Sequence, residues 1–268
     1  MPSDFLTHID WRQPWLAPIK PMAERVLQAD SWAAVLTALA CSKDLRNAKR
    51  LPIRFVPQTD LPAGVAYETF IYETGGVPTR DNLHDFFNAL VWLTFPRIKV
   101  MLNRLQANEI ARRALEVQAA HQVRGKLRDA ATIFDENAVL FLTSDQAFSS
   151  FLRHHQWQEM FVKRRQQFDR HCSVYLFGHA LMEKLVTPYK AITGHAWVVH
   201  TPPEFFALPE SAKLAWLDIE IAHQLEKGLN TTDFSHLPVL GVPGWWPAQD
   251  ESFYADSSVF RPAKRQQE

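Results

Sequence analysis

Residues 79–95 read TRDNLHDFFNALVWLTF, and this stretch predicts a helix with two chemically different sides. At about 100° per residue the apolar side chains gather on one side; they are Leu83, Phe86, Phe87, Leu90 and Leu93, with Thr94. An opposing arc of about 100° holds the polar side chains and one tryptophan; they are Asp81, His84, Asp85, Asn88 and Trp92. Thr79 is the expected N-cap, and Pro96 prevents the helix from continuing much further.

The polar arc has two structural interpretations and one functional interpretation. It can be the solvent face of an amphipathic helix, or a buried network in which His84 and Asn88 bond to neighbouring backbone. Its residues are poorer helix formers than the Lys, Glu, Arg and Gln of ordinary solvent faces, which favours a site or a buried polar network over a solvent face. In the functional interpretation His84, Asp85 and Asn88 are catalytic, and His84 is a general base or a metal ligand. Asp81 or Asp85 would orient the His84 ring or share the metal.

His179 and Glu183 form a second candidate pair, four residues apart on an expected helix over residues 178–186. Helical metal sites use this spacing, although the HExxH pattern is absent. A structural histidine beside a surface glutamate is the simpler interpretation. If the fold brings this pair to His84, we expect Asp81, His84, His179 and Glu183 to hold a divalent metal ion.

Basic residues concentrate in residues 97–128, whereas acidic residues dominate residues 201–260. Mutual neutralisation is the simpler explanation, and a basic groove for a phosphate-bearing ligand is the functional one. The candidate binding residues are Arg80, Trp92, Arg124, Arg128 and Asp129. Arg offers a rigid bidentate fork to phosphate or carboxylate, although an internal Arg–Asp salt bridge is the simpler role for the last three. The formal net charge of zero argues against a dedicated non-specific nucleic-acid binder.

The order of patterns predicts an α+β fold, predominantly helical, with a small and mostly antiparallel sheet. Beyond the helices already described, helices are expected over residues 22–48, 97–120, 144–155, 157–170 and 209–228. Strands are expected over residues 65–73, 174–177 and 196–200, and residues 131–142 are expected to form a hairpin that turns at Asp135-Glu136-Asn137. Residues 1–21 should be extended and residues 229–268 an irregular arm rich in Pro and Trp. The 268 residues suit a single globular domain, 1–268.

Cysteine usage and hydropathy predict a soluble cytoplasmic protein without a membrane partner. Cys41 and Cys172 show neither disulfide nor metal spacing, which indicates a reducing compartment. Residues 1–20 lack the pattern of a signal peptide, and no apolar run approaches the ~18–20 residues of a membrane span. The absence of P-loop, G-x-G-x-x-G and G-x-S-x-G motifs argues against ATPase, dehydrogenase and α/β-hydrolase chemistry.

Four segments of this chain carry a family resemblance. They are PTRDNLHDFFNALVWL (78–93), RDA (128–130) with FDEN (134–137), FGHALMEKL (177–185), and PGWWP (243–247) with FRP (260–262). Together they make the chain similar, over most of its length, to a bacterial family known as domain of unknown function 3025. The resemblance implies no activity and assigns no catalytic residue.

The leading functional hypothesis is a metal-assisted hydrolase that acts on an anionic or phosphorylated small molecule. A divalent ion would lower the pKa of a bound water, and the basic stretch would favour the anion. The alternative is a non-catalytic module that binds RNA, a nucleotide or a protein through the basic helix and exposed aromatic rings. A third interpretation is a scaffold protein whose polar arc is a satisfied core network.

Overall fold

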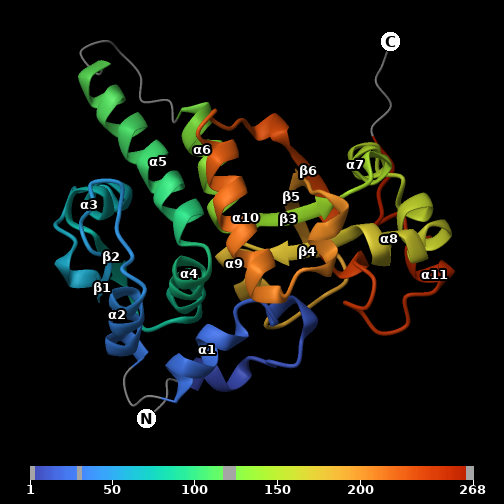
Figure 1. Cartoon of the computed structure of the whole chain (residues 1–268), viewed down its shortest axis with the longest axis horizontal. Helices are drawn as coiled ribbons and strands as arrows, with labels where there is room; N and C mark the ends of the chain where they lie inside the picture. Colours follow the sequence, from blue (N-terminus) through green and yellow to red (C-terminus); the bar gives the residue numbers. More distant parts are fainter. Residues whose placement is uncertain (1–3, 29–31, 117–124, 264–268) are drawn as a thin grey trace.

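The computed structural model describes residues 4–28, 32–116 and 125–263. In this part of the chain, helices surround a four-stranded sheet, and a two-stranded sheet lies apart from it (Figure 1). The α-helices are α1 (Lys20–Leu27), α2 (Trp32–Ser42), α3 (Tyr67–Thr74), α4 (Leu83–Thr94), α5 (Pro96–Glu116), α6 (Lys126–Asn137), α7 (Gln146–Arg153), α8 (Arg165–His171), α9 (His179–Lys184), α10 (Glu210–Leu225) and α11 (Glu251–Tyr254). None of the described helices is both long and apolar enough to cross a membrane. The predicted class, α+β and mainly helical, is confirmed.

The larger sheet has the strand order β4-β3-β5-β6. Its strands are β3 (Ala138–Thr143), β4 (Cys172–Leu176), β5 (Thr193–His200) and β6 (Phe234–Pro238). The pairs β3–β4 and β5–β6 are antiparallel, and the central pair β3–β5 is parallel. Every residue of β3 is buried, as expected for a continuous apolar strand that is covered on both faces.

The smaller sheet corrects one sequence prediction. Its strands β1 (Arg54–Pro57) and β2 (Gly76–Thr79) are parallel, and the crossover between them contains α3. A strand was expected over residues 65–73 because aromatic and β-branched residues alternate there. The segment is helical because it packs along α5, where the Asn103 amide donates to the backbone and side-chain oxygens of Glu68. Gly75 ends the helix in a left-handed conformation, with φ of 71°.

The predicted hairpin over residues 131–142 is also wrong. Asp135, Glu136 and Asn137 form the last turn of α6, and β3 begins at the next residue. Ala130, Ala131 and Phe134 are fully buried, which is the spacing of a helix that presents one face to the core. Short apolar runs fit a strand or a buried helix equally well, so local pattern could not separate them.

The helix α4 is buried around its whole circumference, because every residue from Asp85 to Leu93 is shielded from solvent. A solvent face on this helix is therefore excluded. Asn82, and not the expected Thr79, is its N-cap; Thr79 is the last residue of β2. The helix ends at Thr94, before Pro96, as predicted.

The two ends of the chain are more ordered than the sequence indicated. Residues 1–21 were expected to be extended, but 3₁₀ turns cover Asp4–His8 and Pro14–Leu16, and α1 begins at Lys20. Residues 229–268 were expected to be irregular, but Phe234–Pro238 forms the edge strand β6 and α11 follows. The alternation of apolar and polar residues in β6 is difficult to recognise in the sequence, because the strand is short and ends in proline.

Candidate metal centre

The start of α4 is anchored by a cap and an ion pair. The side-chain oxygen of Asn82 accepts a hydrogen bond of 2.8 Å from the backbone N–H of Asp85. The Asp85 carboxylate accepts from the backbone N–H of Arg80 at 2.6 Å, and from Nε and Nη2 of its guanidinium at 2.9 Å each. Both Asp85 oxygens thus bond to Arg80, the residue that follows β2. These bonds hold the first turn of α4, which contains His84, against the end of β2.

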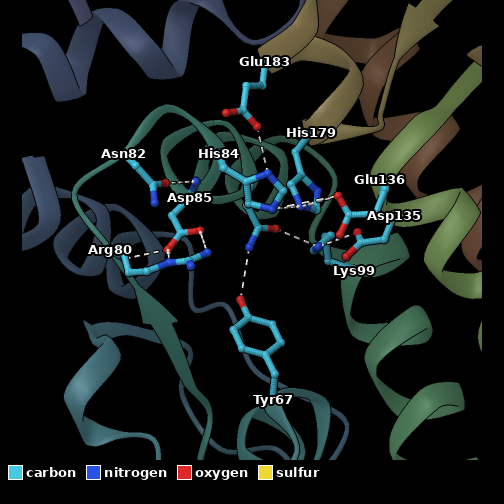
Figure 2. A network of polar contacts seen from close by, with 11 residues as sticks. Tyr67, Arg80, Asn82, His84, Asp85, Lys99, Asp135, Glu136, His179 and Glu183 are labelled. Carbon is cyan, nitrogen blue, oxygen red and sulfur yellow. Dashed lines mark hydrogen bonds and ion pairs between the residues drawn. The ribbon is translucent and has the colours of Figure 1, made fainter. Parts of the chain in front are cut away.

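Three helices meet at His84 (Figure 2). His84 belongs to the first turn of α4, Glu136 to the last turn of α6, and His179 is the first residue of α9. Of the described residues, these three form a group whose ligand atoms all lie within 4.8 Å of one another. Segments far apart in the sequence therefore place two imidazoles and one carboxylate at one point.

The three ligand atoms form a compact triangle with sides between 3.1 and 3.9 Å. Nε2 of His84 lies 3.1 Å from Nε2 of His179. Oε2 of Glu136 lies 3.3 Å from the His179 nitrogen and 3.9 Å from the His84 nitrogen. A point equidistant from the three atoms is therefore about 2.0 Å from each, which matches the 2.0–2.2 Å of zinc bonds to histidine and carboxylate. Two His and one Glu form a ligand set that catalytic zinc sites use.

A glycine makes this triangle possible. Gly178 precedes His179, and a Cβ built on it would lie 2.5 Å from the Cα and N atoms of Asn137. Side chains do not tolerate such a distance to backbone, so only glycine lets the start of α9 approach the end of α6 this closely. The Gly178 N–H also donates to the carbonyl of Ala138 at 2.9 Å.

Glu183 lies behind His84 and orients it. Its Oε2 is 3.0 Å from Nδ1 of His84, on the side of the ring opposite the triangle. A carboxylate in this place accepts a hydrogen bond from the Nδ1–H of His84. The unprotonated nitrogen is then Nε2, and its lone pair is available to a metal. The predicted pair His179 and Glu183 thus reaches His84, with Glu183 contacting the ring and not the triangle.

Burial keeps His179 neutral. Desolvation lowers the pKa of His179 to about 3; Asp135 opposes this shift, while Lys99 and His84 reinforce it. Burial also raises the pKa of Glu136, and the negative charge of Asp135 adds to that effect. A neutral imidazole is the form that binds metal, and a cation at the triangle would offset the cost of a buried carboxylate.

A buried lysine stands beside the triangle. Lys99 of α5 is 4% exposed, and its Nζ lies 2.5 Å from Oδ1 of Asp135 and 2.9 Å from Oδ1 of Asn88. The amide of Asn88 donates to the Tyr67 hydroxyl at 3.1 Å. Burial would raise the pKa of Asp135, but the charge of Lys99 and the hydrogen bond from its ammonium outweigh it, so the pKa is lowered. Asn88 therefore belongs to a satisfied polar network next to the triangle.

Two hollows adjoin these residues. The first, called the histidine pocket, has a volume of about 290 Å³, and its lining includes His84, Glu136 and His179. The second, called the arginine pocket, has a volume of about 190 Å³ and includes Arg128. Both are lined by the same four residues, which are Tyr67, Glu68, Asp135 and Glu136. The two hollows are therefore neighbours, separated by side chains that face both.

Comparison with known proteins places these residues in a family. The family model described as Protein of unknown function (DUF3025) matches residues 53–264, which is most of the chain. The chain belongs to this family. All three residues of the triangle fall inside the matched range. No curated protein and no solved structure matches the chain.

Several residues that the sequence suggested for the site of this DUF3025 chain lie elsewhere. Asp81 precedes α4, and its carboxylate accepts a hydrogen bond of 2.8 Å from Nε1 of Trp32, so it is not part of the triangle. Trp92 is 1% exposed and packs over Lys99, which leaves no ring face for a ligand. Arg124 lies outside the described residues.

Other predicted binding residues do face the hollows. Arg80 lines the histidine pocket, although its guanidinium is engaged by Asp85. Arg128 lines the arginine pocket, and its Nε is shielded from solvent without a hydrogen-bond partner among the described residues. Asp129, one residue further along α6, is absent from the lining of both pockets.

Sequence reasoning missed Glu136, Lys99, Tyr67 and Glu68 in this DUF3025 chain. Glu136 was assigned to a turn, and Lys99 to an exposed basic helix. A signal was present for each. Arg128, Thr132 and Glu136 follow at intervals of four residues, and Lys99 interrupts the apolar run Ile98-Lys99-Val100-Met101-Leu102. The spacing of Arg128, Thr132 and Glu136 becomes informative only once residues 126–137 are known to be helical.

Proposed function

We propose that this protein is a metal-dependent hydrolase whose divalent ion is held by His84, His179 and Glu136. The single observation that carries the proposal is the triangle of Nε2, Nε2 and Oε2, whose common centre lies about 2.0 Å from each atom. Three protein ligands are typical of catalytic sites, because a fourth position remains for water. The histidine pocket supplies the space for that water and for a substrate.

The surrounding residues support hydrolytic chemistry. A bound divalent ion would supply water with a lowered pKa and would polarise a carbonyl or phosphoryl oxygen. Glu183 fixes the His84 ring through Nδ1. Glu68 lines both pockets, and burial together with the charge of Asp135 raises its pKa to about 7, which suits a group that exchanges protons at neutral pH.

The substrate in this proposal is anionic, and Arg128 is the residue that would bind its charge. A guanidinium stays protonated, so a buried Nε without a partner leaves one donor unused in the arginine pocket. Arg128 and Glu136 are eight residues apart on α6, which is ~12 Å along the helix axis. A small molecule of that length would reach the triangle while its carboxylate or phosphate contacts Arg128.

The free cysteines fit the cytoplasmic location that belongs to this proposal. Cys41 is exposed and Cys172 is buried, and neither is in a disulfide. An exposed free thiol is more easily kept in a reducing compartment. A divalent ion bound by nitrogen and oxygen ligands, without thiolate, is compatible with that setting.

Metal titration of the purified protein tests the proposal. We expect one equivalent of Zn²⁺ to bind after treatment with a chelator, as measured by calorimetry and elemental analysis. His84→Ala and Glu136→Gln should weaken binding strongly, and Glu183→Gln by about 10–100-fold, because it removes the group that orients His84. His200→Ala is the matched control, since this exposed histidine ends β5, outside the triangle.

The competing explanation is a hydrogen bond between the two imidazoles, which the 3.1 Å separation also permits. It makes the opposite prediction. If wild-type protein and His84→Ala bind Zn²⁺, Mn²⁺ and Mg²⁺ equally weakly, the polar cluster is a structural network and the hydrolase proposal is wrong. With metal bound, a panel of phosphate and carboxylate esters should show hydrolysis that His84→Ala abolishes.

A further inference from the structure

A third hollow lies away from the two pockets described above. It has a volume of about 1130 Å³ and is lined by residues 43–48, by Arg50, by α5 and by α10. We call it the basic groove, because its lining includes five Arg or Lys side chains and one His; they are Lys43, Arg46, Arg50, Arg97, Arg104 and His223. Asp44 and Glu226 are the acidic residues of the lining.

The helix α5 separates the basic groove from the metal centre. Arg97, Val100, Met101 and Arg104 line the groove at intervals of three and four residues, so they share one face of α5. Lys99 contacts Asp135 on the other side, and Gln106 lines the arginine pocket. At about 100° per residue these two sets point in opposite directions. The groove is therefore a separate surface, and not an extension of the histidine pocket.

Three of the cations in the described part of the chain form no close ion pair. Arg46 pairs with Asp44 at 2.8 Å, and Arg104 lies 3.8 Å from Glu226. Lys43, Arg50 and Arg97 make no side-chain ion pair or hydrogen bond within residues 4–28, 32–116 and 125–263. A hollow with one sign of unpaired charge attracts ligands of the opposite sign.

One further carboxylate faces this cluster. The charge of Lys43 acts on Asp218 of α10, and that of Arg97 does as well. Asp218 is buried, however, and its two oxygens accept backbone N–H donors from Arg97 at 3.1 Å and Ile98 at 3.0 Å. It caps the start of α5 through these backbone donors and, among the described residues, forms no ion pair with the Arg97 guanidinium.

The loop that carries Lys43 and Arg50 is held rigidly. Asn47 is 2% exposed, and its amide donates to the carbonyls of Ile71 and Tyr72 at 2.9 and 2.8 Å. Its side-chain oxygen accepts from the backbone N–H groups of Lys49 and Leu51, at 3.0 Å each. A loop fixed in this way loses little freedom when a ligand binds, which favours affinity.

Arg50 occupies a backbone position that glycine would fill with less strain. Its φ is 67°, in the left-handed region that non-glycine residues adopt at a cost of roughly 1 kcal/mol or more. Within the described residues, its side chain makes no hydrogen bond or ion pair that would offset this cost. The Arg50 guanidinium is therefore available to a ligand in the groove.

We propose that the basic groove binds a nucleoside diphosphate or triphosphate. Lys43, Arg50 and Arg97 would contact the phosphates, since guanidinium and ammonium groups are the usual phosphate donors. Apolar side chains line the same groove, and Ile219 of α10 is 54% exposed. Val100, Met101 and Ile219 therefore offer a surface for a base and ribose, which inorganic phosphate could not use.

Calorimetric titration of the full-length protein with ADP, ATP, pyrophosphate and a short single-stranded RNA tests this proposal. Chelator is present throughout, so that the metal centre does not contribute. We expect ADP and ATP to bind more tightly than pyrophosphate, and the affinity to fall with salt. Arg50→Gly should weaken ADP binding about tenfold without lowering the melting temperature, because glycine suits the left-handed position. Arg97→Gln should weaken it similarly.

Two controls keep the result specific to the groove. Arg153→Gln removes the same charge from the exposed end of α7 and should leave ADP affinity unchanged. His84→Ala should also leave it unchanged, because the groove and the metal centre lie on opposite sides of α5. Equal ADP affinity in wild type and Arg50→Gly would overturn the proposal, as would binding of RNA without binding of ADP.

Discussion

At the scale of single residues, Lys99 shows how burial changes the meaning of a charge. In the sequence it belongs to a basic helix, yet its ammonium is buried between Asp135, Asn88 and the Trp92 ring. A buried charge is costly unless it is paired and hydrogen-bonded, and both conditions are met here. Lys99 therefore neutralises Asp135, and the charge that remains at the triangle is that of Glu136.

Glu68 gives a prediction for the pH dependence of stability. Its folded-state pKa is raised to about 7 from 4.5, mainly by burial. The folded state therefore holds an extra proton between these values, so this contribution to stability is complete below about pH 4.5 and is lost as the pH rises towards 7. Glu68→Gln should remove that loss and raise the unfolding free energy at pH 8 by about 3 kcal/mol.

Urea unfolding of the metal-free protein at several pH values checks this. Glu73→Gln, an exposed substitution at the other end of α3, is the matched control and should follow the wild-type pH profile. An identical pH profile for wild type and Glu68→Gln would contradict the burial of this carboxyl group.

At the scale of elements, the site depends on where helices begin and end. Glu136 is in the last turn of α6, His179 starts α9, and His84 lies in the first turn of α4. Side chains from three helices can meet at one point when the helices come together at their ends, because the helices then need not pack side by side along their length. Gly178 sets the approach of α9 to α6, since any larger residue would meet the Asn137 backbone.

Gly178→Ala is accordingly expected to be destabilising and to damage the site. The added methyl group forces the backbone of α9 or α6 to move, at a cost of about 1–3 kcal/mol. The same movement separates His179 from Glu136, so Zn²⁺ affinity should fall although no ligand has been removed. Gly228→Ala is a useful comparison, because a Cβ there meets nothing within 4 Å, while its φ of 89° supplies strain alone. Wild-type metal affinity in Gly178→Ala would contradict this account.

At the scale of the whole molecule, a bound ion would connect three distant parts of the chain. His84 comes from the helix after the small sheet, whereas Glu136 and His179 flank strands of the large sheet, β3 and β4. An ion that binds the folded state alone stabilises it by mass action, by about 2.7 kcal/mol at a hundred times its dissociation constant. Bound metal should therefore stabilise the start of α4, which follows the small sheet, together with the ends of α6 and α9 that flank the large sheet.

Thermal unfolding and hydrogen exchange measure this connection. With Zn²⁺ in excess we expect the melting temperature to rise by several degrees, and amides at the start of α4, the end of α6 and the start of α9 to exchange more slowly together. His179→Ala should abolish both effects. Protection confined to one of the three helices would show that the ion binds elsewhere.

Much of the fold and part of the site follow from the sequence because their signals are local. The α4 helix could be placed from its apolar spacing and Pro96, and the strand Val174–Phe177 from its continuous apolar run. The relation of His179 to Glu183 needs only a helical period of four residues. Short carboxylates, imidazole and amide in place of the usual Lys and Glu marked the polar arc of α4 as unusual.

The sequence by itself thus determined which side chains are available and on which helical faces they lie. Only the tertiary structure decided that residues 126–137 are a helix, that Glu136 and neither Asp81 nor Glu183 is at the triangle, and that Lys99 is buried. The physical reason is that these outcomes depend on packing between segments far apart in the chain. A carboxylate has the same local chemistry in a turn as at a helix end, and its neighbours across the fold give it a role.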